Sequence, residues 1–496
     1  MPASSRGRCY LRVVKTPSAT TLKRGNRLLM ADAAWRLGFR NVGLGLWGKG
    51  PGHWLAGRRL GVSLANPLGG ADIRPLWEAN RWTVLPPAPE AFCRGWMAEN
   101  PPFQGPNWLC GQEAALRVLH LAPLLPPELP AWAREVVAAH ARRIAANPAY
   151  ALAQDNNHPI SEAAGLLACR LLLGGDARRA SRALDRSVAR LVGPDGGFAQ
   201  PSPAYHRLML DVLTAVEALR RQRGGPPAAP VTLERAAAAA RVLAQLACPE
   251  TGALPRIGHQ DGSAFDGQPE DARGSLGRAA ALFGAPSTNA EWQSAGYRGW
   301  ASGQARAVMR QGPLRFRPGH ADLLHLDLWD GPLNLLRDGG TGAYNPAPAD
   351  AWWLDYFPST AAHNTVEFDG HDQMPRVSRF LHARWARGGE GWVRDYAGNL
   401  HRRAVAARGR EWRVRDELEG PFASAALRWR LAPGEWRLVG QGVESSLGRI
   451  AVTADAPVSV TLEAGWESLA YGQVSPCPVL VARGRAGWVE TLVTLP

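Results

Sequence analysis

The sequence predicts a multidomain α+β protein: an N-terminal (α/α) toroid, in the form of an incomplete barrel, followed by a C-terminal antiparallel β-sandwich. Before residue 300, apolar residues recur at helical spacing in one segment after another. Beyond it they alternate with polar residues at the period of two that is typical of strands. The 496 residues also exceed the size of one ordinary core, which favours two or more domains.

The N-terminal part predicts a series of helices, because each segment carries a helical apolar stripe and Gly or Pro occupies the gaps. These segments span residues 110–125, 130–147, 161–175, 177–193, 205–222, 233–247 and 272–284. Consecutive helices of this length pack as an antiparallel array that closes, wholly or in part, into a toroid. No strict sequence repeat is present, which disfavours a regular solenoid.

The C-terminal part predicts strands separated by turns, in the pattern of an antiparallel sandwich. The alternating segments span residues 323–331, 363–370, 410–420, 427–442, 449–465 and 478–496. Helices followed by a run of strands indicate two domains rather than one mixed sheet. We therefore predict an α/α toroid domain over residues 1–300 and a β-sandwich domain over residues 301–496.

The net charge of +14 is carried almost entirely by arginine, since Lys15, Lys23 and Lys49 are the only lysines. A high genomic base bias accounts for much of this composition. Arginine nonetheless suits bidentate contact with carboxylate or sulfate, so the charge favours a polyanionic partner. We expect no nucleic acid among its partners.

Cysteine spacing and hydropathy argue against several other classes of protein. The six cysteines are scattered without a CxxC pair, which argues against a disulfide framework and against a thiolate zinc site. No apolar run approaches the length of about 20 residues needed for a membrane span. The N-terminus shows no signal-peptide hydrophobic region, so we expect a cytoplasmic protein, or a periplasmic one if the start is misassigned.

The segment QDNNHPISEAAGL (residues 154–166) places amide and imidazole groups before a predicted helix. Asn156, Asn157 and His158 crowd the loop, Pro159 suits the first helical turn, and Glu162 lies one turn further along. Asn before Pro is also an ordinary helix cap. The alternative is a site where these donors, beside the positive end of a helix, bind a carboxylate.

The segment SPAYHRLML (residues 202–210) puts a phenol beside an imidazole at a helix entrance. Tyr205 and His206 follow the turn-rich run GPDGGFAQP, whose glycines let a substrate approach the backbone closely. Alone, such a pair is more often core or cap. A phenol and an imidazole can also pass protons, which makes them candidate acid and base groups.

His320, Asp338 and His363 fall in three blocks of the β-domain, 18 and 25 residues apart. Two imidazoles and a carboxylate suit Zn²⁺ and leave a fourth position for water. The spacing is no local metal motif, so ordinary strand residues that pair across a sheet are the alternative. Other ligands available nearby are Asp322, His325 and Asp327.

The segment PRIGHQDGSAF (residues 255–265) is a polar loop between predicted helices. It carries His259, Gln260 and Asp261 in a row. A solvated loop is the ordinary explanation, and the rim of a binding site is the alternative.

In order along the chain, these blocks resemble the heparinase II/III-like polysaccharide lyases. The similar blocks are DNNHPISEAAGL, DGGFAQPSPAYHRLMLD, GHADLLHLDLW, LLRDGGTGAYN and YFPSTAAHNTVEFDGHDQM. The Asn-His and Tyr-His pairs and the AAHNTVEFDGHDQ block are the most specific. WEANRW and ENPPFQGPNWLCGQEAALRVLHLA are similar to a subgroup associated with bacterial exopolysaccharide gene clusters.

The resemblance implies an α/α toroid, a β-sandwich and a cleft between them for a glycan chain. It also implies β-elimination at a uronic acid. Asn157 and His158 would neutralise the carboxylate, and Tyr205 would act as acid and base, with an arginine or His206 supplying a nearby positive charge. The expected substrate contacts are Asn156, Glu162, His259, Gln260 and His371.

The resemblance further implies one metal ion, with zinc expected, held by His320, Asp338 and His363 and shaping the cleft wall. Several family lyases place an additional catalytic His just ahead of the position of His320, where this chain has FRPG. His371, His259 or Tyr356 would substitute for it, unless Tyr205 performs both proton transfers.

We therefore predict a polysaccharide lyase that cleaves an acidic, uronic-acid-containing polysaccharide. A non-catalytic glycan-binding or exopolysaccharide-assembly factor on the same fold is one alternative, which the missing His favours. A glycoside hydrolase is another. That chemistry needs two carboxylic acids beside the bond, for which Glu162 and Asp261 are the obvious groups.

Overall fold

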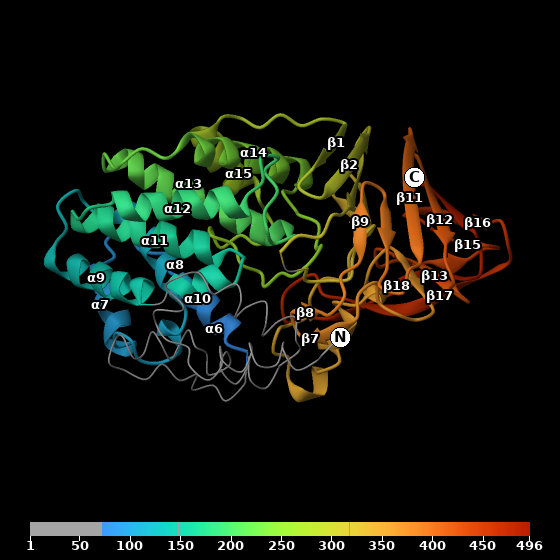
Figure 1. Cartoon of the computed structure of the whole chain (residues 1–496), viewed down its shortest axis with the longest axis horizontal. Coiled ribbons are helices and arrows are strands. Elements are labelled where there is room, and N and C mark those ends of the chain that lie inside the picture. Colours follow the sequence, from blue (N-terminus) through green and yellow to red (C-terminus); the bar gives the residue numbers. More distant parts are fainter. Residues whose placement is uncertain (1–71, 147, 317) are drawn as a thin grey trace, which may run out of the picture.

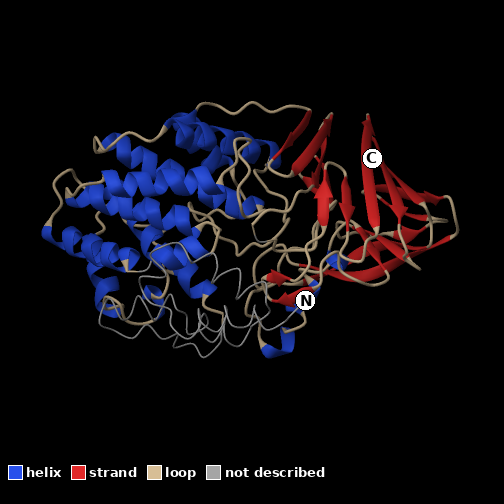
Figure 2. Ribbon diagram, viewed as in Figure 1, coloured by secondary structure: helices blue, strands red, loops and turns tan. Residues whose placement is uncertain are grey.

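The structure is a computed structural model that describes residues 72–146, 148–316 and 318–496. The predictions that concern the first 71 residues, above all the missing signal peptide and the state of Cys9, lie outside the described residues. Helices form the first part of the described chain and strands the second, as Figure 2 shows.

The helical domain has a helix in each of the seven predicted segments, and the described residues add three α-helices that were not predicted, the first, second and fifth in the list that follows. Its α-helices are α6 (Arg74–Ala79), α7 (Glu90–Glu99), α8 (Gly111–Leu121), α9 (Ala131–Ala145), α10 (Pro148–Ala153), α11 (His158–Leu173), α12 (Arg178–Leu191), α13 (Pro203–Gln222), α14 (Pro230–Leu246) and α15 (Arg273–Phe283). Short 3₁₀ turns, η1 (Pro106–Trp108) and η2 (Ala122–Leu124), flank α8.

Helix α11 is central to this array (Figure 1). It packs against α8, α9, α12 and α13, and α13 packs in turn against α14 and α15. A Cβ on Gly165 of α11 would lie only 2.3 Å from the Cβ of Ala115 on α8, so glycine lets these two helices approach closely.

Two helix starts position the segments singled out in the sequence. Helix α11 begins at His158 with Pro159 in its first turn, where a missing N–H costs nothing. Helix α13 begins at Pro203, and the Ser202 hydroxyl caps it by accepting a hydrogen bond of 3.3 Å from the Tyr205 N–H. Both candidate loops are therefore held on rigid helix N-termini.

The strands form antiparallel sheets. The first contains, in this order, β1 (Glu291–Ser294), β2 (Tyr297–Ser302), β3 (Ala305–Arg310), β4 (Leu326–Asp330) and β5 (Leu333–Leu336). An eight-stranded sheet has the order β14 (Arg437–Leu438), β15 (Gly442–Ser445), β16 (Gly448–Ala454), β19 (Trp488–Thr494), β12 (Glu411–Glu419), β11 (Leu400–Arg408), β10 (Trp392–Arg394) and β9 (Arg387–Gly389).

A four-stranded sheet has the order β17 (Val458–Glu467), β18 (Ser475–Gly484), β13 (Ala425–Arg430) and β6 (Val366–Phe368). A small hairpin pairs β7 (Arg376–Ser378) with β8 (Leu381–His382). Between the strands lie the short helix α16 (Trp353–Tyr356) and the 3₁₀ turns η3 (Pro348–Asp350) and η4 (Thr360–Ala362).

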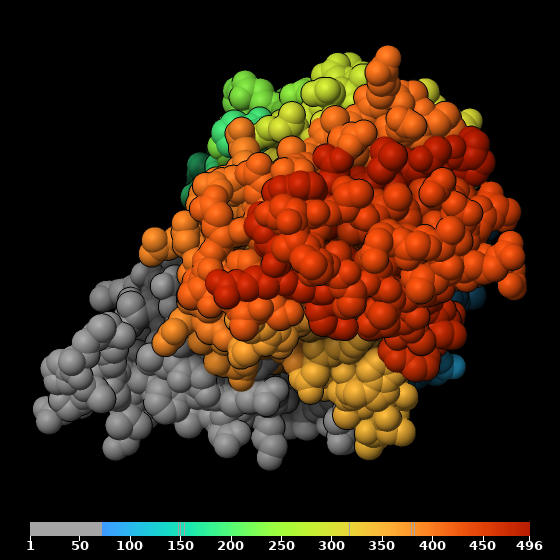
Figure 3. Space-filling model, turned by 90° about the vertical axis from the view of Figure 1, so that its right-hand side faces the viewer, coloured from blue at the N-terminus to red at the C-terminus, as the bar shows by residue number. Residues whose placement is uncertain are grey.

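The eight-stranded and four-stranded sheets share one core. Side chains of β12 alternate between buried and exposed, and its buried Trp412 and Val414 join Trp429 of β13 and Leu480 of β18. Trp429 also donates a hydrogen bond of 3.0 Å from its indole N–H to Thr491 of β19. The predicted helical domain followed by an antiparallel β-sandwich is confirmed, and Figure 3 shows the sandwich end, coloured orange to red.

The first sheet lies between the helical domain and the sandwich (Figure 1). Tyr297 at the start of β2 belongs to the helical core, whereas Trp300, three residues on, belongs to the sandwich core. The division predicted at residue 300 falls inside this strand, and the strands begin earlier, at Glu291. The two cores are thus tied together by a shared sheet rather than by a linker.

No helix in the described part of the chain is long and apolar enough to cross a membrane. The five cysteines that the structure describes are all buried and unpaired, as expected for a chain without a disulfide framework.

Candidate active site

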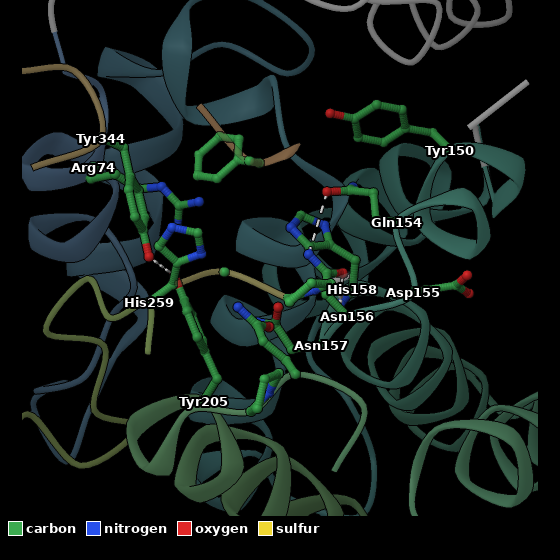
Figure 4. Close-up of a pocket in the computed structure, with 15 residues that line it drawn as sticks. Arg74, Tyr150, Gln154, Asp155, Asn156, Asn157, His158, Tyr205, His259 and Tyr344 are labelled. Atoms are coloured by element: carbon green, nitrogen blue, oxygen red, sulfur yellow. Dashed lines mark hydrogen bonds between the residues drawn. The ribbon is translucent and has the colours of Figure 1, made fainter. Parts of the chain in front are cut away.

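A pocket of about 200 Å³ opens where the helical domain meets the β-domain. We call it the proximal pocket. It is lined by Asn156, Asn157 and His158 from the start of α11, by Tyr205 from α13 and by His259 from the predicted polar loop. Figure 4 shows Tyr205 and His259 on one side of the pocket and the α11 residues facing them. Five residues from three separated sequence blocks are therefore brought together.

Asn157 precedes the first residue of α11 and is buried. Its amide N–H donates a hydrogen bond of 2.8 Å to Oε1 of Gln112 on α8, which fixes the orientation of the side chain. The neighbouring Asn156 accepts a hydrogen bond of 3.1 Å from the His158 N–H through its Oδ1. Amide, imidazole and helix N-terminus together make this wall of the pocket suited to an anion.

The imidazole of His158 is positively charged near neutral pH. Burial lowers its pKa, but contacts with Cys110 and Glu162 raise it, to a value of about 9. Nδ1 of His158 lies 3.3 Å from Oε1 of Glu162, one turn further along α11, and 3.9 Å from the sulfur of Cys110. Glu162 thus acts on the site through His158, and it does not line the proximal pocket itself.

Tyr205 and Tyr344 place two phenol groups together at the pocket. Their hydroxyl oxygens are 3.0 Å apart, and both side chains are almost entirely buried. Burial and the neighbouring Asp261 carboxylate raise the pKa of Tyr205 well above its usual value, while the Arg74 guanidinium lowers it. Tyr205 is therefore held in its hydroxyl form, as a proton donor.

Arg74 is the cation of this side of the pocket. Its guanidinium forms an ion pair with Asp261 and lies 5.4 Å from the ring centroid of Tyr344. Asp261 also accepts a hydrogen bond from the Ser263 hydroxyl. The charge expected beside Tyr205 is thus supplied by an arginine.

The structure separates His206 from this pocket. Its ring turns into the helical core, where Nε2–H donates a hydrogen bond of 2.8 Å to the carbonyl oxygen of Ala239 on α14. Burial lowers the pKa of His206 to about 4, so the side chain is neutral. Adjacent positions of a helix point about 100° apart, which explains why Tyr205 faces the pocket and His206 does not.

Three other expected residues lie outside the proximal pocket. Gln260 is buried next to it and accepts a hydrogen bond of 3.3 Å from Arg256. His371 sits on an exposed turn, with its Nδ1 2.6 Å from the carbonyl oxygen of Asp369. The Tyr356 hydroxyl accepts hydrogen bonds from the Arg430 guanidinium and from the Trp466 N–H, at 3.0 and 3.1 Å.

A cluster of His320, Asp338 and His363 lies behind the pocket wall. One ligand atom of each residue can be chosen so that all three lie within 4.8 Å of one another, and all three residues are buried. Nδ1 of His363 is 2.8 Å from Oδ2 of Asp338. Among the described residues, none provides a hydrogen-bond partner for either ring nitrogen of His320 or for Nε2 of His363. Since buried polar atoms are rarely left unpaired, these donors fit a metal ion.

His325 and Asp327, two of the other candidate metal ligands, contact each other and further groups. Nδ1 of His325 accepts a hydrogen bond of 2.9 Å from the Asn364 N–H, and its Nε2 is 3.0 Å from Asp327. Nε2 of His325 also approaches Asp338 at 3.5 Å, so it supports the cluster from outside. Asp322 is buried, and burial raises the pKa of its carboxyl.

The cluster of His320, Asp338 and His363 and the proximal pocket share a wall through His259. The His259 ring makes edge contacts with the rings of His320 and Tyr344, with centroids 4.7 and 5.5 Å apart. A Cβ on Gly319 would lie 2.4 Å from Nδ1 of His259, so the residue before His320 leaves room for this ring. A displacement of His320 would therefore also move the His259 ring that lines the proximal pocket.

Sequence reasoning missed Arg74, Tyr344 and Gln154, which also line the proximal pocket. Arg74 lies in the short helix α6, just before the block WEANRW, and nothing in its local sequence distinguishes it from other arginines. Tyr344 and Gln154 fall inside quoted blocks, LLRDGGTGAYN and QDNNHPISEAAGL, and only the fold shows that they face the pocket.

Comparison with known proteins identifies the C-terminal part by sequence. Residues 285–487 match the family described as heparinase II/III-like, C-terminal. No curated protein matches the chain.

Solved structures match the chain over most of its length. A crystal structure of heparinase III has a TM-score of 0.63 at 15% sequence identity. The match covers 82% of this chain and 72% of the heparinase III chain. The heparan sulfate lyase HepC from Pedobacter heparinus has a TM-score of 0.57 at 16% identity, with coverages of 85% and 74%. Likeness at this identity concerns the fold. The chain has the two-part fold of these structures, and its C-terminal region over residues 285–487 belongs to the heparinase II/III-like family.

Proposed function

We propose that this protein is a polysaccharide lyase that cleaves a uronic-acid-containing acidic polysaccharide by β-elimination. The observation that carries the proposal is the meeting of Asn157, His158 and Tyr205 in one pocket at the junction of the two domains. The family match and the fold support lyase activity in general. The names of the similar structures, heparinase III and heparan sulfate lyase, make sulfated uronans the first substrates to try.

The first requirement of the reaction is to stabilise the substrate carboxylate. The C5 proton of a uronic acid lies α to that carboxylate and is too weakly acidic to leave unaided. Asn157 and the charged His158 would donate to the carboxylate oxygens as negative charge develops on them. Because Glu162 and Gln112 already fix the two side chains, little reorganisation is needed when the substrate binds.

The second requirement is proton transfer. In its hydroxyl form Tyr205 is suited to protonate the O4 leaving group. To act as base as well, it would first have to lose its proton, and Arg74 is the cation that opposes the effect of Asp261 and eases this loss. Tyr344 and His259 are the other groups of the pocket near Tyr205.

We further propose that His320, Asp338 and His363 hold one zinc ion. Two imidazoles and a carboxylate are a donor set that zinc accepts readily and calcium does not. When bound, the ion would fix the cluster through its ligand bonds. His320 would then hold the ring of His259 in the pocket wall, at the place where the glycan lies.

A glycoside hydrolase fits this pocket less well, because that chemistry uses two carboxylic acids beside the bond. Among the described residues that line the proximal pocket, Asp155 is the single carboxylate, and it is 2.6 Å from Arg190 in an ion pair. Of the acids considered from sequence, Glu162 is engaged with His158 and Asp261 with Arg74.

The test is to incubate the protein with heparan sulfate, alginate, hyaluronan and polygalacturonate and to follow absorbance at about 232 nm, where an unsaturated uronate absorbs. Elimination gives a rise on at least one polymer, and the Tyr205→Phe protein is the matched control. A fall in polymer length without this absorbance would indicate hydrolysis instead. Binding of a polymer without any cleavage would indicate the non-catalytic alternative.

A further inference from the structure

A second pocket, of about 330 Å³, adjoins the proximal pocket in the same junction between the domains. We call it the distal pocket. Pro201 lines both pockets, and the ion pair between Asp155 and Arg190 joins a lining residue of one to a lining residue of the other. The two hollows are therefore neighbours along one path. A volume of this size lies within the range of about 300–1,000 Å³ that is usual for ligand sites.

The distal pocket is built from both domains, at a contact that fixes its shape. The loop after α12 meets the β1–β2 turn, where Oδ2 of Asp195 accepts a hydrogen bond of 2.8 Å from the Ala295 N–H. The Ser294 hydroxyl donates to the carbonyl oxygen of Asp195 at 2.5 Å. A Cβ on Gly197 would lie 2.9 Å from Cα of Ala295, so the two backbones touch. The pocket is thus preformed in the protein without a ligand.

The charged groups that line the distal pocket favour an anion. They are the guanidinium groups of Arg190, Arg310 and Arg315 and the carboxylates of Asp195 and Glu390. Asp195 is engaged by the N–H groups of Gly197 and Ala295. Arg190 is a third exposed and is partly neutralised by Asp155. Arg310 is buried and donates to the carbonyl oxygens of Gly296 and Gln311.

Arg315 is the cation most available to a ligand. It is exposed on the loop after β3, and none of the carboxylates in the described ranges lies within ion-pair distance of it. A guanidinium in this setting binds carboxylate or sulfate oxygens through two N–H groups at once.

We propose that the distal pocket binds the next anionic sugars of the same glycan chain, with Arg315 contacting a carboxylate or sulfate. The proposal rests on the proposed function, because it assigns the sugar to be cleaved to the proximal pocket. Only a glycan long enough to span both pockets can fill them. The protein therefore binds long acidic oligosaccharides more tightly than short ones.

The experiment measures binding against chain length. Size-fractionated oligosaccharides of heparan sulfate and of alginate are titrated calorimetrically into the Tyr205→Phe protein, so that no turnover interferes. Affinity is expected to rise with length until both pockets are filled. Arg315→Ala is then expected to weaken binding of the long oligosaccharides by about 5- to 10-fold, the effect of one charge-assisted contact, and to flatten the dependence on length.

Two further variants make the result specific. Arg437 of β14 lies on the opposite edge of the eight-stranded sheet from β9, is also exposed, and Arg437→Ala is the matched control. Gln293 is exposed on β1 beside the distal pocket, and Gln293→Trp fills the pocket without removing a charge. It is expected to reproduce the loss for long oligosaccharides, whereas Arg437→Ala is expected to change nothing.

The outcomes separate the two proposals. Cleavage with absorbance at about 232 nm, but equal affinity for all lengths and no effect of Arg315→Ala or Gln293→Trp, overturns the distal pocket and leaves the lyase. Length-dependent binding that Arg315→Ala weakens, with no unsaturated product from any polymer, supports the distal pocket and overturns the lyase. An equal loss in the Arg437→Ala protein would mean that general surface charge drives binding, and it too overturns the distal pocket.

Discussion

The hydroxyl oxygens of Tyr205 and Tyr344 lie 3.0 Å apart, although one residue comes from the helical domain and the other from the β-domain. The candidate active site is therefore completed only when the two domains dock. Tyr471, also from the β-domain, supports this arrangement, because its hydroxyl accepts a hydrogen bond of 2.8 Å from the Tyr344 N–H. A variant that loosens the domain contact is expected to affect the tyrosine pair before it affects either core.

The first prediction is that Tyr205→Phe lowers turnover by about a hundredfold or more while the protein stays folded. The substitution removes one hydroxyl and leaves the packing of the ring in place. Turnover is measured as the rate of unsaturated product, and folding by circular dichroism and thermal unfolding. Tyr297→Phe is the matched control, since it removes the hydroxyl of another buried tyrosine that does not line the proximal pocket. Near-normal turnover of the Tyr205→Phe protein would assign the proton transfer to another group.

The order of helices and strands could be predicted from sequence, because the spacing of apolar residues differs between the two. All seven predicted helical segments contain helices, and the alternating segments contain strands. Several strands lie outside the predicted segments, including β1, β2, β3 and the nine-residue β11. The hairpin turn that joins β1 to β2, at Ala295 and Gly296, interrupts the pattern after only four residues of β1, which is too short for a period of two to show.

The site could be predicted only in part, because side-chain direction depends on packing. Asn157, His158 and Tyr205 were found through their motif blocks. His206 belongs to the same block, yet it turns to the carbonyl oxygen of Ala239 on a helix 33 residues further along. Arg74 reaches the pocket through its ion pair with Asp261, 187 residues away in the chain. Contacts over such separations leave no local signal.

The second prediction concerns Asp261, whose carboxylate raises the pKa of Tyr205. Asp261→Asn removes that negative charge and leaves Arg74 without its ion-pair partner, and both changes lower the pKa of Tyr205. If Tyr205 acts as a proton donor, its activity is lost when it ionises. Burial still raises the pKa of Tyr205 in this variant, so the alkaline limb of the profile of kcat/KM against pH is expected to move to lower pH than in the wild type. An unchanged limb would show that Asp261 does not act through Tyr205.

The third prediction concerns the positive charge on His158. Its pKa of about 9 depends in part on Glu162, so Glu162→Gln lowers that pKa and neutralises His158 at a lower pH. We expect KM for an acidic polysaccharide to rise several-fold at pH 8 while it changes little at pH 6, where the imidazole stays charged.

Thermal unfolding gives an independent check of the same pair. Because the pKa of His158 in the folded protein lies above the value of about 6.5 for an unperturbed His, the charged imidazole stabilises the folded state. That stabilisation is fully present below about pH 6.5 and is lost as the pH rises through about 9. The difference in melting temperature between wild type and Glu162→Gln is expected to shrink over this range. A KM that rises equally at both pH values would point to altered packing instead.

The last prediction is that the protein, purified without a histidine tag, contains about one zinc per chain. His363→Ala removes one of three buried ligands, so we expect it to lower the zinc content below about a tenth of an equivalent and to lower the melting temperature. A chelator should destabilise the wild type and leave this variant unaffected. His401 provides the matched control, because it is a buried His of the same domain, 2.6 Å from Asp416 and outside the cluster. His401→Ala is expected to lower stability as well, because it removes a buried side chain and its contact with Asp416, but to keep its zinc. Wild-type protein that carries no zinc even when zinc is supplied during growth would mean that His320, Asp338 and His363 serve the fold without a metal.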